Sequence, residues 1–217
     1  MTVCRISLIV GLASAAVAIF SSANTSAAEF VVTEDIVTVS GTIQAADDTS
    51  FSNLLSSPRG KKVRTALFEA CYGGKVGAST RIADQIEQRR LATIARGQVS
   101  SGCAVAFMAG RTRSVDVANG PAALIFHNGT HANGTRVDDI EALPARLDRY
   151  TNRKLKDPLR EFIRNAKTDS GVVFFFPKAG DRNRPSVGFC SGTLKKDLRD
   201  CRVYPNESAS KSGILKR

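Results

Sequence analysis

The chain has 217 residues and a formal net charge of +11, from 31 Lys and Arg against 20 Asp and Glu. Hydrophobic residues make up 42% and charged residues 24%, which is typical of a globular domain and excludes a disordered, collagen-like or coiled-coil chain. The two histidines are too few for a histidine-rich metal site, and we expect neither a metal nor an organic cofactor.

Residues 1–28 have the pattern of a secretory signal peptide. Arg5 precedes an apolar stretch over residues 6–20, and small residues end the segment at 26–28. This pattern predicts cleavage before Glu29. A retained membrane anchor is the alternative, but the stretch is shorter than the ~20 apolar residues that span a bilayer. We therefore expect a periplasmic or secreted protein with no stable membrane span after the leader is removed.

Four cysteines remain once the leader is gone: Cys71, Cys103, Cys190 and Cys201. An even number of cysteines in an oxidising compartment predicts disulfides, and four cysteines allow three pairings. Cys190 and Cys201 enclose ten residues, which suits a closed local loop that would stabilise the fold by about 2–3 kcal/mol. Free buried thiols are the alternative. The sequence has no CxxC spacing, so it does not predict a structural zinc site.

Many of the basic residues are dispersed along one segment with helical periodicity. The segment lacks interleaved aromatic residues and any known nucleic-acid-binding motif. A solvated helix face is therefore the favoured interpretation, and we expect no nucleic-acid partner. An acidic partner or an anionic membrane surface stays open. The residues are Arg146, Arg149, Arg153, Lys154, Lys156, Arg160 and Arg164.

In chain order, the remaining sequence alternates between predicted strands and helices. Short connections between them predict parallel βαβ units in one α/β domain. Asp47 or Asp48 is expected to cap the first helix, which ends at 58–60, and residues 211–217 are expected to fray. The predicted strands are 30–32, 36–39, 63–68, 94–99, 122–126 and 172–176, and the later helices are 79–90, 102–109, 138–153 and 155–167.

Two predicted strand ends carry residues that suit an oxyanion site. Gly73 and Gly74 follow the strand 63–68, and adjacent glycines can expose backbone N–H groups to an oxyanion or a thioester carbonyl. Ser101 and Gly102 stand at the mouth of a small-residue helix, where the N–H of Gly102 could complete such a site. A simple turn and a helix N-cap are the alternatives.

A third strand end carries a histidine. His127 directly follows the apolar strand 122–126, so its imidazole is expected at the carboxyl edge of the sheet. There it could accept the proton of a serine hydroxyl as a general base. A structural histidine is the alternative.

Together these segments resemble the ClpP/crotonase superfamily, and most of all its exported (periplasmic) serine-protease-like branch. The resemblance covers roughly residues 37–127. The separation of 26 residues from Ser101 to His127 is close to the spacing in the Clp protease proteolytic subunit. The matching segments are Gly41-Thr42-Ile43, Gly73-Gly74-Lys75-Val76, Ile82-Ala83-Asp84-Gln85-Ile86, Ser101-Gly102-Cys103, Phe107-Met108-Ala109-Gly110-Arg111 and Phe126-His127.

The resemblance implies stacked βαβ units over residues 29–180 with a C-terminal helical segment. Residues 181–217 have no counterpart in the family, so we interpret them as an extension closed by a Cys190–Cys201 loop. It also implies a disulfide between Cys71 and Cys103, because the glycine turn and the serine turn must converge to build one oxyanion hole.

Roles follow from the same resemblance. Ser101 matches the nucleophile, His127 the general base, and Gly74 and Gly102 the oxyanion-hole donors, with Gly73 aiding the turn. The family places an Asp before a late strand, a position that Asp169 fits better than Asp181. Three positions depart from the family pattern: glycine stands at 102 where alanine is usual, Cys71-Tyr72 precede the glycine pair, and Val99 stands where a cysteine is often found.

These features predict an exported serine hydrolase that acts as a peptidase on peptide or protein substrates. The alternative is a catalytically inactive member of the fold that serves as a binding or assembly module. Either kind of protein could form a homo-oligomer. A crotonase-type enzyme acting on acyl thioesters is disfavoured, because export separates it from coenzyme A. Lys75 beside the glycines would suit a Ser–Lys pair, but the family pattern favours His127.

Overall fold

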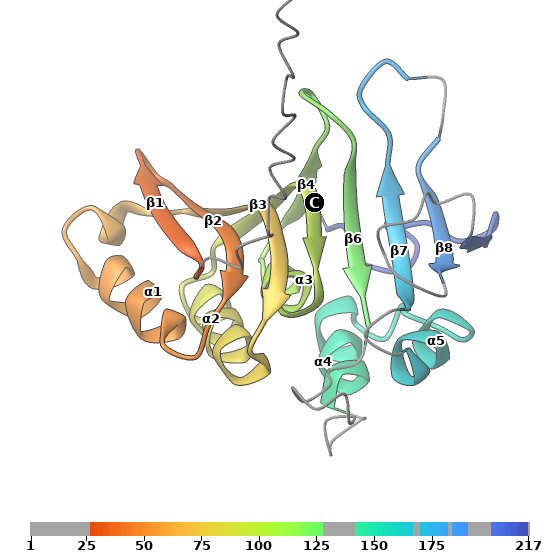
Figure 1. The fold of residues 1–217 in the computed structure, drawn as a ribbon, viewed down its shortest axis with the longest axis horizontal. Coiled ribbons are helices and arrows are strands. Elements are labelled where there is room, and N and C mark those ends of the chain that lie inside the picture. Colours follow the sequence, from red (N-terminus) through yellow and green to blue (C-terminus); the bar gives the residue numbers. More distant parts are fainter. Residues whose placement is uncertain (1–26, 128–141, 167–169, 182–183, 191–200, 217) are drawn as a thin grey trace, which may run out of the picture.

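The computed structural model describes residues 27–127, 142–166, 170–181, 184–190 and 201–216 (Figure 1). Most of the predicted leader and the predicted Asp169 lie outside these residues. The elements are β1 (Glu29–Thr33), β2 (Ile36–Ile43), α1 (Asp47–Ser56), η1 (Gly60–Lys62), β3 (Thr65–Gly74), α2 (Val76–Gln88), β4 (Ala92–Ser100), α3 (Ser101–Met108), β5 (Arg113–Asp116), β6 (Ala122–Phe126), α4 (Ala142–Thr151), α5 (Leu159–Asn165), β7 (Gly171–Phe176), β8 (Ser186–Cys190) and β9 (Cys201–Val203).

The strands of the described residues form one mixed sheet in the order β1-β2-β3-β4-β6-β7-β8-β9, with β5 paired to the first half of β4. β2, β3, β4, β5 and β6 are parallel to one another, which confirms the predicted βαβ units. β1, β7, β8 and β9 are antiparallel to their neighbours. In Figure 1 the strands run from β1 on the left to β8 on the right. The sequence patterns did not predict β5, β8 or β9.

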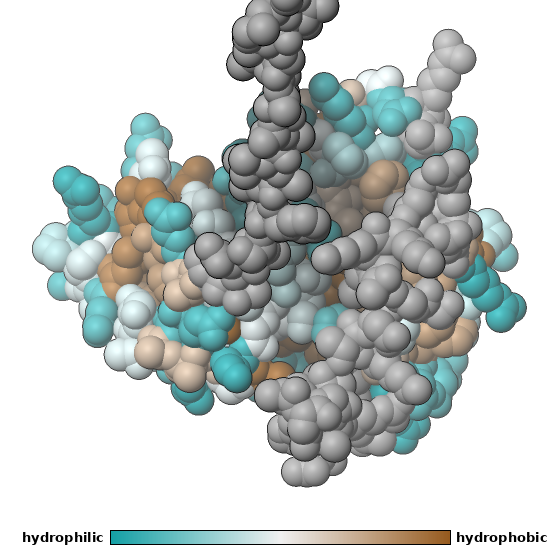
Figure 2. All heavy atoms as spheres, in the orientation of Figure 1, coloured by the Kyte–Doolittle hydropathy of each residue, from teal (hydrophilic) through white to brown (hydrophobic). Residues whose placement is uncertain are grey.

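The centre of the molecule is α3, which packs on β3, β4 and β6 and is flanked by α2 and α4. Nearly every residue of α3 is buried, and its small side chains let it lie close to the sheet. Phe107 at its end meets Phe68 of β3 edge to face, with ring centroids 6.5 Å apart. Val31 of the edge strand β1 is half exposed, and Figure 2 shows hydrophobic atoms on this side of the molecule.

The start of α1 differs from the prediction. The N-cap residue is Ala46, which makes no side-chain capping bond. The Asp47 carboxylate instead accepts hydrogen bonds from the N–H groups of Gln44 (2.6 Å) and Ala28 (3.1 Å) and closes the turn before the helix. Asp48 pairs with Arg81 of α2, whose guanidinium lowers the pKa of that carboxyl. The two aspartates therefore join segments far apart in sequence rather than cap the helix.

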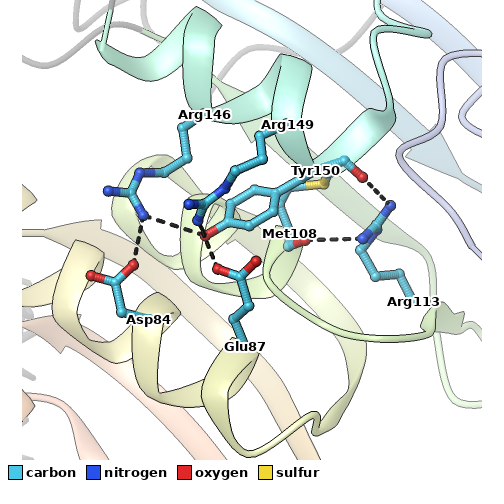
Figure 3. A network of polar contacts seen from close by, with 7 residues as sticks. All are labelled: Asp84, Glu87, Met108, Arg113, Arg146, Arg149 and Tyr150. Carbon is cyan, nitrogen blue, oxygen red and sulfur yellow. Dashed lines mark hydrogen bonds and ion pairs between the residues drawn. The ribbon is translucent and has the colours of Figure 1, made fainter.

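Ion pairs join the basic segment that includes α4 to α2 (Figure 3). Arg146 pairs with Asp84 (2.9 Å) and Arg149 pairs with Glu87 (2.7 Å), and both guanidinium groups donate to the hydroxyl of Tyr150. The interpretation of this segment as a solvated helix face is therefore incomplete, because two of its arginines hold neighbouring helices together. Within the described residues, no helix is long and apolar enough to cross a membrane.

The C-terminal residues do not fray as predicted. Ile214 is fully buried, and Lys216 forms a β-bridge with Arg113. The buried guanidinium of Arg113 donates five hydrogen bonds of 2.8–3.0 Å to backbone carbonyls. Burial lowers its pKa to about 10. The carbonyls belong to Met108, Gly110, Tyr150, Gly213 and Ile214, and Figure 3 shows the first and third of these contacts.

Replacing Arg113 with methionine is expected to lower the free energy of unfolding by about 3 kcal/mol or more. The variant leaves buried carbonyls of three segments without donors, and each unsatisfied group costs about 1–3 kcal/mol. Arg111→Met is the matched control, because Arg111 is exposed and its loss should change stability by less than about 0.5 kcal/mol. Urea unfolding followed by circular dichroism measures both. Equal midpoints for the two variants would contradict this role of Arg113.

Candidate active site

The carboxyl edge of the parallel strands brings together three segments that the sequence predicts to be functional. Gly73 and Gly74 end β3, Ser101 follows β4, and His127 follows β6. β3, β4 and β6 are consecutive in the sheet, and neighbouring strands lie ~4.8 Å apart. In Figure 1 this edge is the lower end of the strands. The segments are therefore close enough to contribute to one site.

The glycine pair has a backbone that other residues rarely adopt. The φ angles of Gly73 and Gly74 are +101° and +134°. A Cβ on Gly74 would lie 1.9 Å from the carbonyl oxygen of Ile43, and a Cβ on Gly73 would lie 2.6 Å from the Cβ of Ser101. Both positions therefore require glycine. The missing side chains let the serine turn pack directly against the end of β3.

Ser101 stands at a strained strand-to-helix turn. It is the first residue of α3 and has a φ of +53°, in the left-handed region that a non-glycine residue rarely occupies. Its side chain is half-buried, and its Oγ lies 3.1 Å from the point where a Cβ on Gly73 would stand. Strained residues of this kind cluster at functional sites. In serine hydrolases of the α/β-hydrolase fold, a sharp strand-to-helix turn presents the nucleophile.

Gly102 allows α2 and α3 to approach each other. A Cβ at this position would lie 2.2 Å from the Oγ and 2.8 Å from the Cβ of Ser79, a buried residue of α2. The same point is 3.7 Å from the backbone nitrogen of Gly74, so the glycine turn and the serine turn are adjacent. Ser79 is a residue that the sequence analysis missed, because nothing in α2 marks it apart from its neighbours. It explains physically why alanine cannot stand at 102 in this chain.

Gly102→Ala is expected to destabilise the fold by about 1–3 kcal/mol, because the added methyl overpacks the contact between α2 and α3. Ser79→Gly removes both atoms that the methyl would strike. In that background, the same substitution should cost much less. A double-mutant cycle from thermal or urea unfolding measures the difference. A cost at Gly102 that is independent of Ser79 would contradict the contact.

The two predicted disulfides are present, and one of them lies under this site. Cys71 of β3 and Cys103 of α3 are fully buried and bonded to each other. Cys190 and Cys201 form the second bond. The N–H of Gly73 donates to the Sγ of Cys103 at 3.2 Å. The bond therefore links the glycine turn to the helix that begins at Ser101.

His127 leaves the sheet beside Gly171 of β7. Ser100 of β4 pairs with Ile125 of β6, so His127 leaves its strand one residue beyond the level of Ser101. A Cβ on Gly171 would lie 3.4 Å from the Cβ of His127 and 2.6 Å from the carbonyl oxygen of Phe126. The glycine at the start of β7 thus lets that strand approach the half-buried histidine.

The alternative third residue, Asp181, lies at the opposite edge. β7 runs antiparallel to β6, and its last residue Phe176 pairs with Ala122 at the start of β6. The N–H of Ala179 then donates to the carbonyl of Val117, before that start. This placement separates Asp181 from His127 by the length of β6. Asp169 lies outside the described residues.

Around this site the described residues include one large exposed aromatic side chain. Tyr72, directly before the glycine pair, is 54% exposed. Val76, the first residue of α2, is also half exposed. Among the described residues, no group of three or more His, Cys, Asp or Glu side chains is arranged to hold a metal ion.

Comparison with known proteins finds similarity in structure but not in sequence. No protein-family profile and no curated protein sequence matches the chain. ClpP1 from Listeria monocytogenes superimposes with a TM-score of 0.50 and 17% identity, covering 84% of this chain and 89% of that one. A mutant of 1510-N, a membrane-bound stomatin-specific protease, gives a TM-score of 0.43 at 10% identity, covering 61% and 68%.

The likeness to ClpP1 spans most of both chains, and it agrees with the parallel sheet, the central helix and the order of the segments along the sequence. At this level of identity the comparison concerns the fold. The chain therefore has a ClpP-like fold.

Proposed function

We propose that this chain is an exported serine hydrolase that cleaves peptides or proteins through an acyl-enzyme. The observation that carries the proposal is the strained backbone of Ser101 at the turn from β4 to α3, packed against the glycine turn of β3. A hydroxyl held at such a turn, on the edge where a neighbouring strand ends in a histidine, has the arrangement that nucleophilic catalysis requires.

In this mechanism the Oγ of Ser101 attacks the substrate carbonyl carbon while its proton passes to the imidazole of His127. The carbonyl oxygen becomes an oxyanion, which accepts hydrogen bonds from the N–H groups of Gly74 and Gly102. Collapse of this intermediate expels the amine, which takes the proton back from His127. Water then repeats the sequence on the acyl-enzyme and releases the acid. The base contributes about 10²–10⁴-fold in rate and each oxyanion donor about 10²–10³-fold.

Asp169 is the third residue of the proposed triad. Gly171, two positions later in the chain, lies beside His127, which supports this choice over Asp181. Its carboxylate would accept the second imidazole N–H and hold His127 in the tautomer that can receive the serine proton.

Two observations support export to the periplasm or the medium. The first 28 residues have the signal-peptide pattern, and the chain contains two disulfides. Disulfides form and persist in oxidising compartments and are rare in the cytosol.

Labelling with a fluorophosphonate, followed by peptide mass mapping, tests the proposal. This reagent phosphonylates a serine only when a base activates it, so the expected result is one adduct, on Ser101. A folded wild-type protein that takes no label at Ser101 would reject catalysis and favour a binding or assembly module of the same fold. Detection of the new amino terminus by mass spectrometry tests export separately, with cleavage before Glu29 expected.

A further inference from the structure

The amino edge of the parallel strands, opposite the candidate site, carries a group of exposed cations. Arg64 precedes β3, Arg89 and Arg90 precede β4, and Arg111 precedes β5. Backbone hydrogen bonds hold the segments before these strands side by side. The N–H of Ala92 donates to the carbonyl of Arg64 at 2.9 Å, and the N–H of Arg111 donates to the carbonyl of Leu91 at 2.8 Å. With the two lysines of η1, the amino-edge cluster consists of Lys61, Lys62, Arg64, Arg89, Arg90 and Arg111.

None of these six cations takes part in an ion pair within the described residues. Every ion pair within the described residues uses an arginine outside the cluster. All six side chains in the cluster are exposed. The C-terminal end of α2 favours Arg89 and Arg90 locally, but the other four lie outside that helix. Six exposed cations that no ion pair within the described residues neutralises therefore gather at one edge of the sheet.

The cluster is suited to a charged surface more than to a single small anion. Beside it, a hollow of about 550 Å³ is lined by Val32, Glu34, Asp35, Arg59 and Lys62. Two carboxylates share this hollow with two cations, so it does not select one phosphate group. The six cations are instead spread over the beginnings of three neighbouring strands and η1, which is the distribution that binds a broad anionic surface.

We propose that the amino-edge cluster binds the surface of a membrane that contains anionic phospholipids. Juxtaposed Lys and Arg residues are attracted to such surfaces without a shaped pocket. Single-stranded nucleic acids are usually held by aromatic rings that stack on the bases. The exposed aromatic ring of the described residues is Tyr72, at the opposite edge of the sheet. The charge pattern without a stacking ring therefore favours lipid.

Binding to a membrane through the amino-edge cluster would fix where the candidate site lies relative to the bilayer. β3 runs from the cluster at Thr65 to the glycine pair at Gly74, which separates the two edges by roughly 30 Å. A protein bound through the amino edge would hold Ser101 away from the bilayer, open to substrates in the surrounding solution.

Co-sedimentation of the full chain with vesicles tests the proposal. Vesicles of phosphatidylcholine alone are compared with vesicles that contain phosphatidylglycerol, and binding to the neutral vesicles measures any contribution of residues 1–28. We expect binding that requires phosphatidylglycerol and weakens as salt increases. Each cation that is neutralised should lower the partition coefficient roughly fivefold. Lys61→Gln with Lys62→Gln should therefore lower it roughly 25-fold, and Arg89→Gln with Arg90→Gln should do the same.

The matched control is Lys156→Gln with Arg202→Gln, which removes the same charge from exposed residues outside the cluster. It should lower binding less than about threefold, and circular dichroism checks that all variants fold. Equal losses in the cluster and control variants would mean that only net charge matters and would overturn the proposal. Equal binding to neutral and anionic vesicles would overturn it as well. Duplex DNA that binds more tightly than the vesicles at the same salt would assign the cluster to nucleic acid instead. None of these outcomes depends on labelling at Ser101.

Discussion

Ser101→Ala is expected to abolish fluorophosphonate labelling and peptide hydrolysis, and His127→Ala to slow both by about 10³-fold or more. A 10³-fold loss corresponds to about 4 kcal/mol of transition-state stabilisation, which is the size of effect that a general base supplies. We expect no neighbouring hydroxyl to act in place of that of Ser101, because the position of Ser101 depends on the turn that packs it against Gly73. The labelling rate, measured at several probe concentrations, gives both values.

The chain supplies a matched control for the serine variant in the preceding residue. Ser100 is the N-cap residue of α3, is buried, and makes no side-chain capping bond. Ser100→Ala is therefore expected to keep the labelling rate within a few-fold of the wild-type rate. Labelling that survives in Ser101→Ala, or that is lost equally in Ser100→Ala, would show that the reactive group lies elsewhere. In either case the proposed nucleophile is wrong, although the fold is unaffected.

The second large effect is expected from the disulfide beneath the site. Replacing Cys71 and Cys103 together with alanine should lower the free energy of unfolding by about 3–4 kcal/mol, because the bond closes a loop of 32 residues. It should also slow labelling of the folded protein by about 10–100-fold. The bond joins β3 to α3, and the Sγ of Cys103 accepts the N–H of Gly73. Loosening this junction would shift the oxyanion donors relative to Ser101, and displacements of about 1 Å can cost 10²-fold in rate.

The other disulfide separates this positioning role from general stabilisation. Cys190 and Cys201 join β8 to β9, and their loss should also destabilise the protein, by about 2–3 kcal/mol. Labelling of the Cys190→Ala, Cys201→Ala variant should nevertheless match the wild-type rate at a temperature where both are folded. Equal slowing in the two double variants would indicate that labelling follows stability alone. Cys71 and Cys103 are fully buried, so a reductant added to the folded protein should change the labelling rate little.

Residues of the candidate site can be proposed from sequence where local chemistry marks them. β6 has its predicted bounds, because an uninterrupted apolar run with a histidine at its end has a strong local pattern. The glycine pair was expected to follow the end of a strand at 68, yet β3 continues through Gly74. Glycine normally weakens a strand, but here the lack of a Cβ is what allows β2 to pair closely with this segment. The lack of a Cβ at these glycines, which suggested that the strand ends before them, is what allows the strand to continue.

Other elements depend on contacts that no local pattern carries. β5 is four residues long and begins at Arg113, a charged residue that composition alone assigns to the surface. The structure buries it among backbone carbonyls of α3, α4 and the C-terminal residues, which is why that segment is ordered rather than frayed. β8 and β9 are short and add to a sheet edge that only the placement of β7 creates.

The sequence by itself determined which candidate residues the chain offers and their order: the glycine pair, the serine, the histidine and an even set of cysteines. These follow from residue type and short-range pattern, which are independent of how distant segments meet. Tertiary structure alone decided that Ser101 has a strained backbone, that Ser79 requires glycine at 102, and that six cations gather at the amino edge. Each of these depends on the register and crossovers of parallel strands, which bring together residues whose separation along the chain gives no measure of their distance in space.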